Sequence, residues 1–380
     1  MDFDLTPEQQ ALRQLARDFA QKEIAPVAAE YDEREEFPLP VYKKLGEVGI
    51  LGMAFPTEYG GGGADLLSLA VVTEELSVVD VPVGVSESVN GMVGSVISFF
   101  GTQAQKDEWL PLLSKGSILC SFGLTEPGAG SDAMAITTRA DLEDGQWVIN
   151  GAKCFITHAG TAMSGFIIVA AVTGRSEGHK EISCFLVPNG TPGYNLGRPY
   201  RKIGWRSSDT RELSFVECAV PEGNLVGELG KGFHQFMAVL DFGRIGIGAV
   251  AVGLARGCLE QSLQYAQSRV QFGGALCTHQ AMQFKLAEMA TNVEAARMMV
   301  HKAAFLQTKG RPFAKEASMA KLFSSEVAVK AAEEGVQIHG GYGYIEEYPI
   351  ARFYRNSKIL TIGEGTSEVQ KMIIARQLGC

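Results

Sequence analysis

The sequence predicts an α+β protein with three consecutive domains: an N-terminal helical domain (1–115), a central β domain (116–228) and a C-terminal helical bundle (229–380). Three observations support this division. Apolar residues recur near the helical period early in the chain, short β-type runs separated by turn residues follow, and long apolar helical runs occupy the last part. A chain of 380 residues also exceeds one comfortable hydrophobic core, which favours two or three lobes.

The N-terminal domain opens with a helix-start signal. Residues 6–9 ("TPEQ") combine a capping threonine, a proline suited to the first turn and a glutamine that completes a capping box. A second helix is predicted over residues 39–49, and the glycine-rich segment 56–65 is predicted to be a loop. From Leu66 to Phe100 the mostly apolar pattern predicts helix again.

Five β-type runs define the central domain. They cover residues 120–124, 146–150, 164–173, 181–188 and 212–220. Their spacing predicts an antiparallel sheet or a small barrel instead of alternating β-α units. No GxGxxG motif follows a strand here, which disfavours a Rossmann nucleotide site.

The C-terminal domain is predicted to be a helical bundle. One very long helical run covers residues 232–270, and two more cover 282–306 and 314–338. A glycine-rich break at 339–344 separates these runs from a last helix that starts after Thr366. Long helices with apolar faces and few caps are typical of a bundle, and we expect four helices in it.

The composition disfavours several classes of function. The net charge of −9 and the pI near 5.3 argue against nucleic acid or an anionic membrane as main partner, although a few local arginines can bind a phosphorylated ligand. No apolar run reaches the ~20 residues that span a bilayer, and the acidic start lacks the features of a signal or transit peptide. We therefore expect a cytoplasmic protein.

The cysteines and histidines show no disulfide or metal-binding pattern. The seven cysteines are scattered and contain no CxxC pair, and the six histidines contain no HExxH motif. We therefore expect no disulfide framework, no structural zinc and no catalytic metal, which fits a reducing cytoplasm.

Two polar segments of the central domain are candidate ligand-binding elements. Residues 125–132 ("TEPGAGSD") follow an apolar strand, and their glycines would let backbone amides and hydroxyls meet a polar ligand edge. The same residues also suit an ordinary strand-ending turn. Residues 153–157 ("KCFIT") place an aromatic ring two positions before a hydroxyl, which could cover a flat ligand ring and bind its edge. A half-buried strand would show the same alternation.

The C-terminal domain contains three further candidates. Arg269 ends a long helix, where it could bind a phosphate or offset the helix dipole. Asp241 and Arg244 flank a mid-helix glycine, which either admits a ligand to the backbone or belongs to a surface ion pair. The three glycines of 337–344 suit either contact with an extended cofactor or an elaborate helix end.

A glutamate between two glycines is the candidate catalytic group. Glu364 stands in "IGEGTS" (362–367). A base that removes a proton next to a carbonyl must be desolvated, aimed at one carbon and free of strong cationic partners. The glycines would let a substrate approach the backbone, whose amide could support the carbonyl as its charge grows. The alternative is a carboxylate that suits the start of the last helix.

Taken in order, eight motifs resemble those of the acyl-CoA dehydrogenases over nearly the whole chain. They are "PTEYGG", "LTEPGAGSD", "FIT", "VLDFGRIGIGA", "SRVQFG", "HQAMQFKLAEMA", "QIHGGYGY" and "IGEGTSEVQ". The resemblance implies that family's plan of α-helical, β-barrel and α-helical domains, the last a four-helix bundle. It also implies FAD-dependent α,β-dehydrogenation of an acyl-CoA thioester to the trans-2-enoyl-CoA. Glu364 would remove the α-proton, and the β-hydrogen would leave as hydride to flavin N5.

The same resemblance implies the roles of other residues. Contacts with FAD in the chain's own site match Phe122, Leu124, Thr125, Gly130, Ser131, Phe155, Thr157, Thr366 and Glu368. Contacts with the FAD of a neighbouring subunit match Arg269, Phe272, Gln280, Gln337, Gly340 and Gly341. Contacts with the CoA ester match Ser131, Asp241, Arg244 and Gly365. Phe155 stands where many relatives carry tryptophan.

The resemblance further implies partners and narrows the substrate. In this family electron-transfer flavoprotein usually reoxidises the flavin, tetramers are usual, and cross-subunit FAD contacts imply at least a dimer. The segment from Leu76 to Gln105, which helps line the family's acyl pocket, contains no Lys or Arg, so a dicarboxylyl substrate would lack a cationic partner. We expect a short- to medium-chain acyl group, straight or branched.

Two rival functions remain open on the sequence. One is an oxidase of the same fold, which would pass electrons directly to oxygen. The other is a catalytically inactive scaffold that binds CoA esters or a protein. The intact Glu364 and the intact flavin motifs argue against the scaffold.

Overall fold

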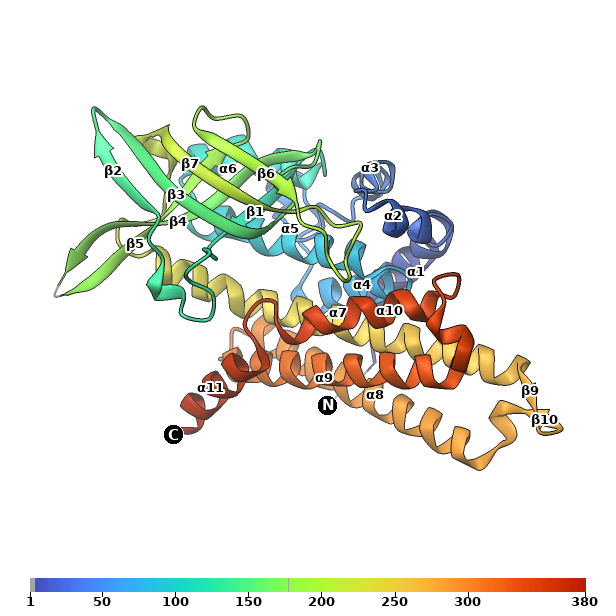
Figure 1. The fold of residues 1–380 in the computed structure, drawn as a ribbon. Coiled ribbons are helices and arrows are strands. Elements are labelled where there is room, and N and C mark those ends of the chain that lie inside the picture. The colour runs from blue at the N-terminus through green and yellow to red at the C-terminus, as the bar shows by residue number, and fades with distance from the viewer. Residues whose placement is uncertain (1–3, 177) are drawn as a thin grey trace.

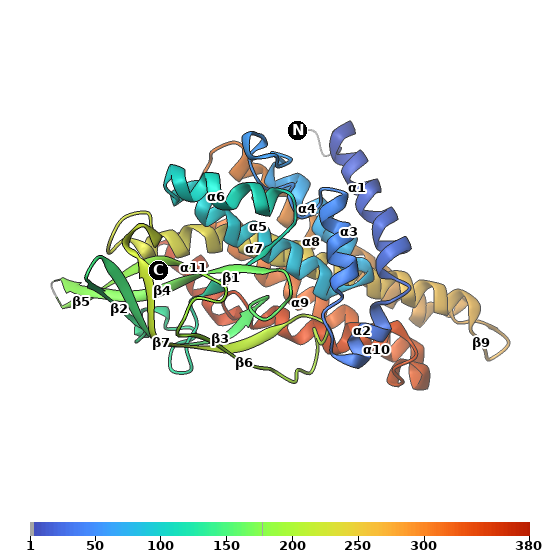
Figure 2. The same ribbon diagram turned by 90° about the horizontal axis from the view of Figure 1, so that it is seen from above.

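The long helix α7 (Gly232–Ser268) crosses the molecule and contacts helices from both ends of the chain as well as the sheet (Figure 1). This computed structural model describes residues 4–176 and 178–380; residues 1–3 of the predicted N-terminal domain and Glu177 of the predicted central domain lie outside the described residues. The sheet lies at one end of the molecule, and the first helices lie at the other (Figure 2).

The N-terminal region is helical, as predicted. Its helices are α1 (Pro7–Phe19), α2 (Ala28–Arg34), α3 (Leu39–Glu47), α4 (Leu66–Val79), α5 (Val81–Phe100) and α6 (Gln103–Ser114), with a π-helical turn at Ala20–Ile24 and a 3₁₀ turn at Thr57–Tyr59. The predicted capping box is present. The Gln9 side chain accepts a hydrogen bond from the Thr6 N–H at 3.1 Å, and the Thr6 hydroxyl accepts one from the Gln9 N–H at 3.2 Å. The run predicted as one helix from Leu66 is two, because Pro82 cannot donate a backbone hydrogen bond to the preceding turn.

The central region forms one open sheet, so the expected closed barrel is wrong. Its strands are β1 (Leu119–Gly123), β2 (Arg139–Glu143), β3 (Gln146–Thr157), β4 (Ser164–Ser176), β5 (His179–Pro188), β6 (Tyr194–Pro199), β7 (Thr210–Pro221) and β8 (Leu225–Val226). The order is β6-β7-β3-β2-β4-β5-β8, with β1 beside β4. The end strands β6 and β8 are not paired with each other among the described residues, and β4 pairs in parallel with β1 and β2. Parallel pairing arises here because each of these pairs is joined by a crossover instead of a hairpin.

Several strands and helices of the structure were not predicted from the sequence. Strand β2 forms a hairpin with β3 through Asp144-Gly145, whose φ values of +48° and +78° match the two-residue turn that Asp-Gly favours. Helix α6 begins with a second capping box, Thr102 with Gln105. Strands β6 and β8, helices α2 and α10 (Pro349–Ser357) and the short hairpin that follows α7 were not predicted either. The Asp-Gly pair and the second capping box are local sequence signals for two of these elements.

The C-terminal region is helical, as predicted. After α7 come a small hairpin of β9 (Val270–Gln271) and β10 (Gly274–Ala275), then α8 (Gln280–Thr308), α9 (Ala314–His339), α10 and α11 (Ser367–Leu378). The hairpin projects at the far end of α7 (Figure 1). Helices α7, α8 and α9 pack together, α10 and α11 pack on α9, and α4 packs against α7 and α8. The helices of the two ends of the chain therefore form one packed assembly.

The largest hydrophobic core runs through all three regions. It joins Val93 of α5, Ile168 of β4, Leu254 of α7 and Val300 of α8, all of them 0–1% exposed. Two smaller clusters lie among the first helices and within the sheet. The three regions therefore differ in secondary structure but are joined by a common core at α5 and α7.

Two helices, α5 and α7, are long and apolar enough by length and composition to cross a membrane, although the uninterrupted apolar runs predicted none. In this structure 67% of the most apolar stretch of α5 and 72% of that of α7 are buried inside the protein, as is usual for helices of a protein core. All seven cysteines are free, five of them buried. Within residues 4–176 and 178–380 no cluster of three His, Cys, Asp or Glu side chains is suited to a metal ion.

Candidate active site

The turn that carries Glu364 links the 3₁₀ helix η7 (Lys358–Thr361) to α11. Glu364 and Gly365 both adopt left-handed backbone angles, with φ of +52° and +94°. The N-cap of α11 is Thr366, whose hydroxyl accepts a hydrogen bond from the Val369 N–H at 3.3 Å. Glu364 is therefore not the helix cap, and its unusual backbone serves another purpose. A left-handed glutamate costs on the order of 1 kcal/mol or more, which the surrounding contacts must offset.

The Glu364 carboxylate lies against the backbone of Gly243 in α7. A Cβ atom on Gly243 would lie 2.5 Å from Glu364 Oε2 and 2.4 Å from Met92 Sδ of α5. The mid-helix glycine was predicted to admit a ligand, but the group that approaches it in this structure is the candidate base itself. Residues 121 positions apart in the chain thus form one wall of the site.

The electrostatic setting of Glu364 suits a base. Its Oε2 atom is buried and has no hydrogen-bond partner among the described residues. Burial raises the pKa of Glu364 to about 7, although the positive charges of Lys321 and Arg244 act in the opposite direction. No described residue donates a hydrogen bond to Oε2, but the charges of Lys321 and Arg244 act on Glu364, which departs from a base without strong cationic neighbours.

Asp241 and Arg244 form the ion pair that was the simpler reading of this motif. The pair is not a surface pair, because Arg244 is only 6% exposed. Burial lowers the pKa of Arg244, and the Nε atom of this residue is buried without a partner among the described residues. Asp241 also borders a pocket of about 740 Å³ that Arg311 and Lys315 line. Glu316 lines the same pocket, so its two basic side chains are balanced by two acidic ones.

The loop 125–132 is anchored at one end and open at the other. Glu126 is buried, and its carboxylate accepts hydrogen bonds from Lys153 Nζ at 2.8 Å and from the Thr137 and Thr138 N–H groups at 2.7 and 3.0 Å. In contrast, Gly128 and Gly130 have no atom within 4 Å of an added Cβ. Thr125 is half-buried, and Gly130 and Ser131 are exposed. The loop is thus held in place through Glu126, and its glycines leave space in which a ligand can approach the backbone.

Phe155 is turned outward by a β-bulge. The register of β3 against β7 shifts between Lys153 and Ile156, and Phe155 has a φ of +60°. Its ring is 67% exposed, while Cys154 and Ile156 on either side are buried. A bulge commonly re-aims a side chain next to a functional site. The half-buried strand that was the alternative for this motif does not explain an exposed phenylalanine.

The neighbouring predicted residues lie on the adjoining strands. The carbonyl of Thr157 accepts a hydrogen bond from Ser121 Oγ at 2.8 Å, which joins β3 to β1. Phe122 on β1 is half-buried against Phe236 of α7, with ring centroids 4.3 Å apart, and Leu124 is buried. Phe122 and Leu124 therefore support the site from behind, and Phe155 and Thr157 form its surface.

Thr366 and Glu368 line a second pocket, of about 410 Å³, at the start of α11. Lys330, Lys358 and Lys371 line the same pocket. Three glutamates, Glu326, Glu333 and Glu368, line this pocket too, so the lysines supply local positive charge in a pocket whose charged side chains balance.

The remaining predicted residues lie far from Glu364. Arg269 follows α7, Phe272 is at the β9–β10 turn, and Gln280 begins α8. Gln337 is near the end of α9, and Gly340 and Gly341 follow it. The Arg269 guanidinium lies 5.7 Å from the ring centroid of Tyr342, one residue after Gly341, so the end of α7 meets the segment that follows α9.

The separation of the two sets follows from helix geometry. Gly243 and Arg269 are 26 residues apart along α7, which corresponds to roughly 39 Å at 1.5 Å per residue. Phe272 at this far end is 98% exposed. The far set is therefore placed to contact something outside the chain.

The residues present fit FAD. The exposed ring of Phe155 offers a surface for a flat ring system, the glycine loop leaves space for backbone approach, and the lysines of the second pocket can pair with phosphate groups. Each of these three features lies in or next to a segment that the sequence analysis singled out.

Five residues that shape the site were not predicted: Met92, Glu126, Lys153, Lys321 and Gln370. A signal existed for Lys321, which is a lone lysine in an otherwise apolar or small run, "ASMAKLF". Glu126 and Lys153 are opposite charges in two segments already suspected of forming one site. Met92 and Gln370 carry no distinguishing signal, because their role depends only on what packs against them.

Comparison with known proteins identifies the family that the eight sequence motifs resemble. Three family models match consecutive parts of the chain: acyl-CoA dehydrogenase N-terminal domain at residues 6–117, middle domain at 121–218 and C-terminal domain at 230–379. The chain is 48% identical over 380 residues to the probable acyl-CoA dehydrogenase YngJ of Bacillus subtilis (strain 168), with 100% of both chains covered.

Two solved structures extend this comparison. Butyryl-CoA dehydrogenase from Megasphaera elsdenii superposes with a TM-score of 0.97 at 42% identity, with 100% of each chain covered. An acyl-CoA dehydrogenase from Bacillus anthracis complexed with FAD superposes with a TM-score of 0.93 at 35% identity, covering 99% of this chain and 67% of that one. With the fold and the buried carboxylate described above, these matches establish that the chain belongs to the acyl-CoA dehydrogenase family and is an FAD-dependent acyl-CoA dehydrogenase.

Proposed function

We propose that Glu364 is the base that removes the α-proton of a short-chain acyl-CoA. The observation that carries this proposal is the buried Oε2 atom, which has no hydrogen-bond partner among the described residues. A carboxylate without a donor keeps its lone pairs for a substrate proton, and a pKa of about 7 places its proton affinity near neutral pH.

The backbone beside Glu364 supports the thioester carbonyl. In the described part of the chain the Glu364 N–H has no acceptor, so it is available to a carbonyl oxygen. A donor at this position stabilises the negative charge that grows as the α-proton leaves. The left-handed turn is what aims the side chain and the N–H of one residue at neighbouring atoms of one substrate.

Phe155, Thr157 and the loop 125–131 hold FAD on the opposite side of the substrate, with Phe122 and Leu124 behind them and Thr366 and Glu368 at the lysine-lined pocket. Bound FAD supplies the acceptor for the β-hydrogen as a hydride. Ser131, Asp241, Arg244 and Gly365 contact the CoA ester. The pocket of about 740 Å³ beside Asp241 supports this assignment, since Arg311 and Lys315 can receive the phosphates of CoA.

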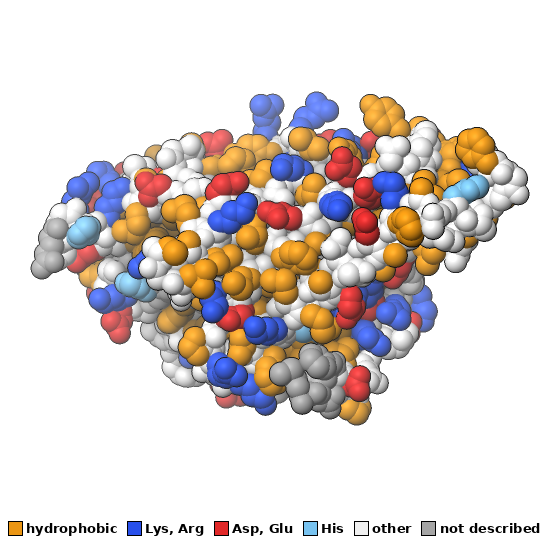
Figure 3. Space-filling model, turned by 90° about the horizontal axis from the view of Figure 1, so that it is seen from below, with side chains coloured by type: hydrophobic (Ala, Val, Ile, Leu, Met, Phe, Trp, Pro, Cys, Tyr) orange, Lys and Arg blue, Asp and Glu red, His pale blue; other side chains and the backbone are white. Residues whose placement is uncertain are grey.

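The far set of Arg269, Phe272, Gln280, Gln337, Gly340 and Gly341 contacts the FAD of a neighbouring subunit. Its separation from Glu364 supports an assembly of at least a dimer, and we infer a homotetramer. Exposed apolar residues that a subunit contact would cover include Phe284 and Phe305 on α8 and Met372 on α11. Many hydrophobic side chains lie between the charged ones on the face of the molecule that Figure 3 shows.

The acyl group is short and carries no carboxylate. Helix α5, whose Met92 borders Glu364, contains no Lys or Arg, so a second carboxylate would be unpaired there. Butyryl-CoA dehydrogenase, a similar enzyme, is named for a four-carbon substrate. The reduced flavin needs an oxidant, and we infer an electron-transferring flavoprotein. A solved chain with 42% identity to this one carries the description of such a protein from Acidaminococcus fermentans.

The test of the base is Glu364→Gln. We expect this variant to bind FAD with an unchanged visible spectrum but to lose anaerobic flavin bleaching by butyryl-CoA roughly 10³-fold, the scale of removing a general base. The control is Glu143→Gln on the exposed surface of β2, which should bleach at the wild-type rate.

Bleaching of Glu364→Gln at a near wild-type rate would show that another group is the base. Peroxide release by the wild type in air, without any added acceptor, would favour an oxidase. Both measurements use the purified FAD-loaded protein.

A further inference from the structure

A buried lysine lies behind the turn of Glu364. Lys321 is in the middle of α9, is 0% exposed, and donates from Nζ to the Gly365 carbonyl at 2.7 Å. Among the described residues Lys321 makes no ion pair with a carboxylate, and Glu364 and Glu368 act on it only by their charge. Removing an ammonium from water costs several kcal/mol, so a lysine held by a carbonyl alone needs a further compensating interaction.

A second buried side chain grips the same turn without carrying charge. Gln370 of α11 is 0% exposed and donates from Nε2 to the carbonyls of Glu364 and Gly365, at 3.2 and 3.1 Å. Gly365 has a φ of +94°, which favours glycine, and a Cβ atom there would lie 2.8 Å from this Nε2. Lys321 of α9 and Gln370 of α11 thus bind the carbonyl groups of the Glu364–Gly365 turn from two different helices.

The charges around Glu364 come from three elements. Arg244 of α7 is already paired with Asp241, and Glu368 of α11 is exposed. Lys321 of α9 is the remaining cation that acts on Glu364, and it is the larger of the two cationic influences. Burial lowers the pKa of Lys321 to about 8, while the negative charges of Glu364 and Glu368 raise it. The compensating interaction for the buried ammonium is therefore the field of Glu364.

We propose that Lys321 is a positioning residue for the reaction: it holds the Gly365 carbonyl and, by its charge, favours the ionised form of the Glu364 carboxylate. This inference rests on the proposed role of Glu364 as base. Lys321 does not touch the substrate. It acts through the turn, so that a poorly solvated carboxylate is more often unprotonated when the substrate arrives.

The test compares charge with shape at position 321. Lys321→Met keeps most of the apolar stem and removes the ammonium. We expect the pH at which flavin reduction reaches half of its maximum to rise by about 1–3 units, the range by which an opposite charge usually shifts a carboxyl group. At high pH the rate should recover toward that of the wild type. Lys321→Arg retains a charge and should restore part of this shift.

A second readout does not depend on turnover. In the substrate-free holoenzyme, the infrared band of the protonated Glu364 carboxyl can be assigned by its loss in Glu364→Gln and then titrated. In Lys321→Met this band should persist to higher pH than in the wild type. Gln370→Met is the matched control, because it removes the uncharged grip on the same carbonyls. It should lower the rate at every pH without moving the pH profile or the band.

Equal slowing of Lys321→Met at every pH, with an unmoved band, would overturn the proposal and leave Lys321 a structural residue. If Lys321→Met does not accumulate as folded protein, Lys321→Gln gives the same comparison with a polar neutral side chain. The Glu364→Gln variant separates the two possible failures. If only the role of Lys321 is wrong, Glu364→Gln still loses bleaching. If the assignment of the base is wrong, Glu364→Gln retains it.

Discussion

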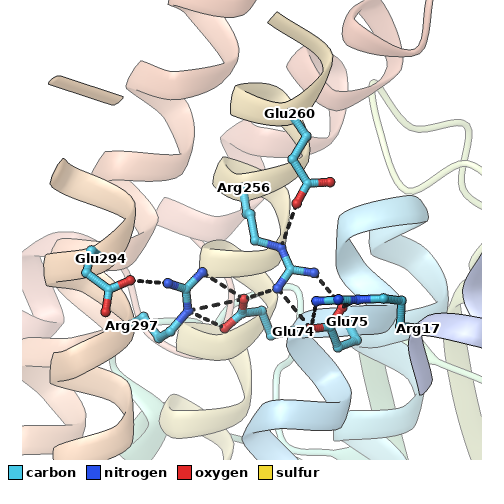
Figure 4. A network of polar contacts seen from close by, with 7 residues as sticks. All are labelled: Arg17, Glu74, Glu75, Arg256, Glu260, Glu294 and Arg297. Carbon is cyan, nitrogen blue, oxygen red and sulfur yellow. Dashed lines mark hydrogen bonds and ion pairs between the residues drawn. The ribbon is translucent and has the colours of Figure 1, made fainter. Parts of the chain in front are cut away.

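The carboxylates of Glu75 and Glu364 both lie near cations, but Glu75 is 2% exposed, whereas Glu364 is half-buried with its Oε2 atom buried. Glu75 of α4 receives hydrogen bonds from Arg256 at 2.5 and 3.0 Å and from Arg17 at 3.0 and 3.1 Å, while its neighbour Glu74 is held by Arg256 and Arg297 (Figure 4). Glu364 has nearby cations that do not bind its Oε2.

The pKa values of the two groups move in opposite directions. Burial alone would raise the pKa of Glu75, but the hydrogen bonds and charges of Arg256 and Arg17 outweigh it and lower that pKa. For Glu364 burial prevails, and the pKa rises to about 7. Burial thus decides the protonation of a carboxylate only when no donor satisfies it. The arginine network joins α1, α4, α7 and α8, whereas the Oε2 atom of Glu364 is left without a donor among the described residues and can accept a substrate proton.

The largest effect on stability is expected from breaking the network. Arg256→Met leaves Glu74 and Glu75 with one arginine each, and removing one partner of a buried ion pair typically costs about 3–5 kcal/mol. Urea unfolding of the holoenzyme should show a lower midpoint. Arg34→Met, which breaks the exposed pair with Glu30, is the matched control and should cost about 0–1 kcal/mol. Equal effects of the two substitutions would contradict the role assigned to burial.

The second effect concerns Glu87 of α5, a buried carboxylate with one neutral donor, Thr73 Oγ1 at 2.6 Å. Burial raises the pKa of Glu87 to about 7. A raised pKa means that the folded state binds the proton more tightly, so stability is greatest below the ordinary carboxyl range and falls as pH rises toward 7. Glu87→Gln should remove this loss and gain up to about 3 kcal/mol above pH 7, at 1.36 kcal/mol per pKa unit.

The measurement for Glu87 is thermal or urea unfolding across the acidic to neutral range. Glu75→Gln is the control with the opposite sign. Because its folded pKa is lowered, Glu75 contributes stability above the ordinary carboxyl range, and its replacement should destabilise the protein there and do so less as pH falls. If both variants change stability equally at all pH values, the contrast between paired and unpaired carboxylates is wrong.

The smallest effect is on the wild-type rate profile. With Glu364 titrating at about pH 7, the rate of anaerobic flavin bleaching should fall about tenfold per pH unit below that value, because only the ionised base accepts the α-proton. Stopped-flow bleaching by butyryl-CoA at a series of pH values measures this decrease in rate. A rate that stays constant down to the ordinary pKa of glutamate would show that burial does not govern this carboxylate in the working enzyme.

Much of the fold and of the site could be predicted from local patterns. The capping box at Thr6, the long run that became α7 and the five β-type runs each depend on a few consecutive residues. The Glu364 turn was readable because two glycines around a carboxylate are unusual. The open sheet was not readable, since the pairing of β4 with β1 and β2 joins residues tens of positions apart.

The sequence by itself determined the three zones of secondary structure, the order of the motifs and therefore the family, because each of these depends on short segments. Only the tertiary structure decided that Gly243 faces Glu364, that Lys321 and Gln370 hold its turn, and that Arg269 lies roughly 39 Å away along α7. The physical reason is that a carboxylate's pKa and its available partners depend on burial and on charges brought together from distant segments, which no local pattern specifies.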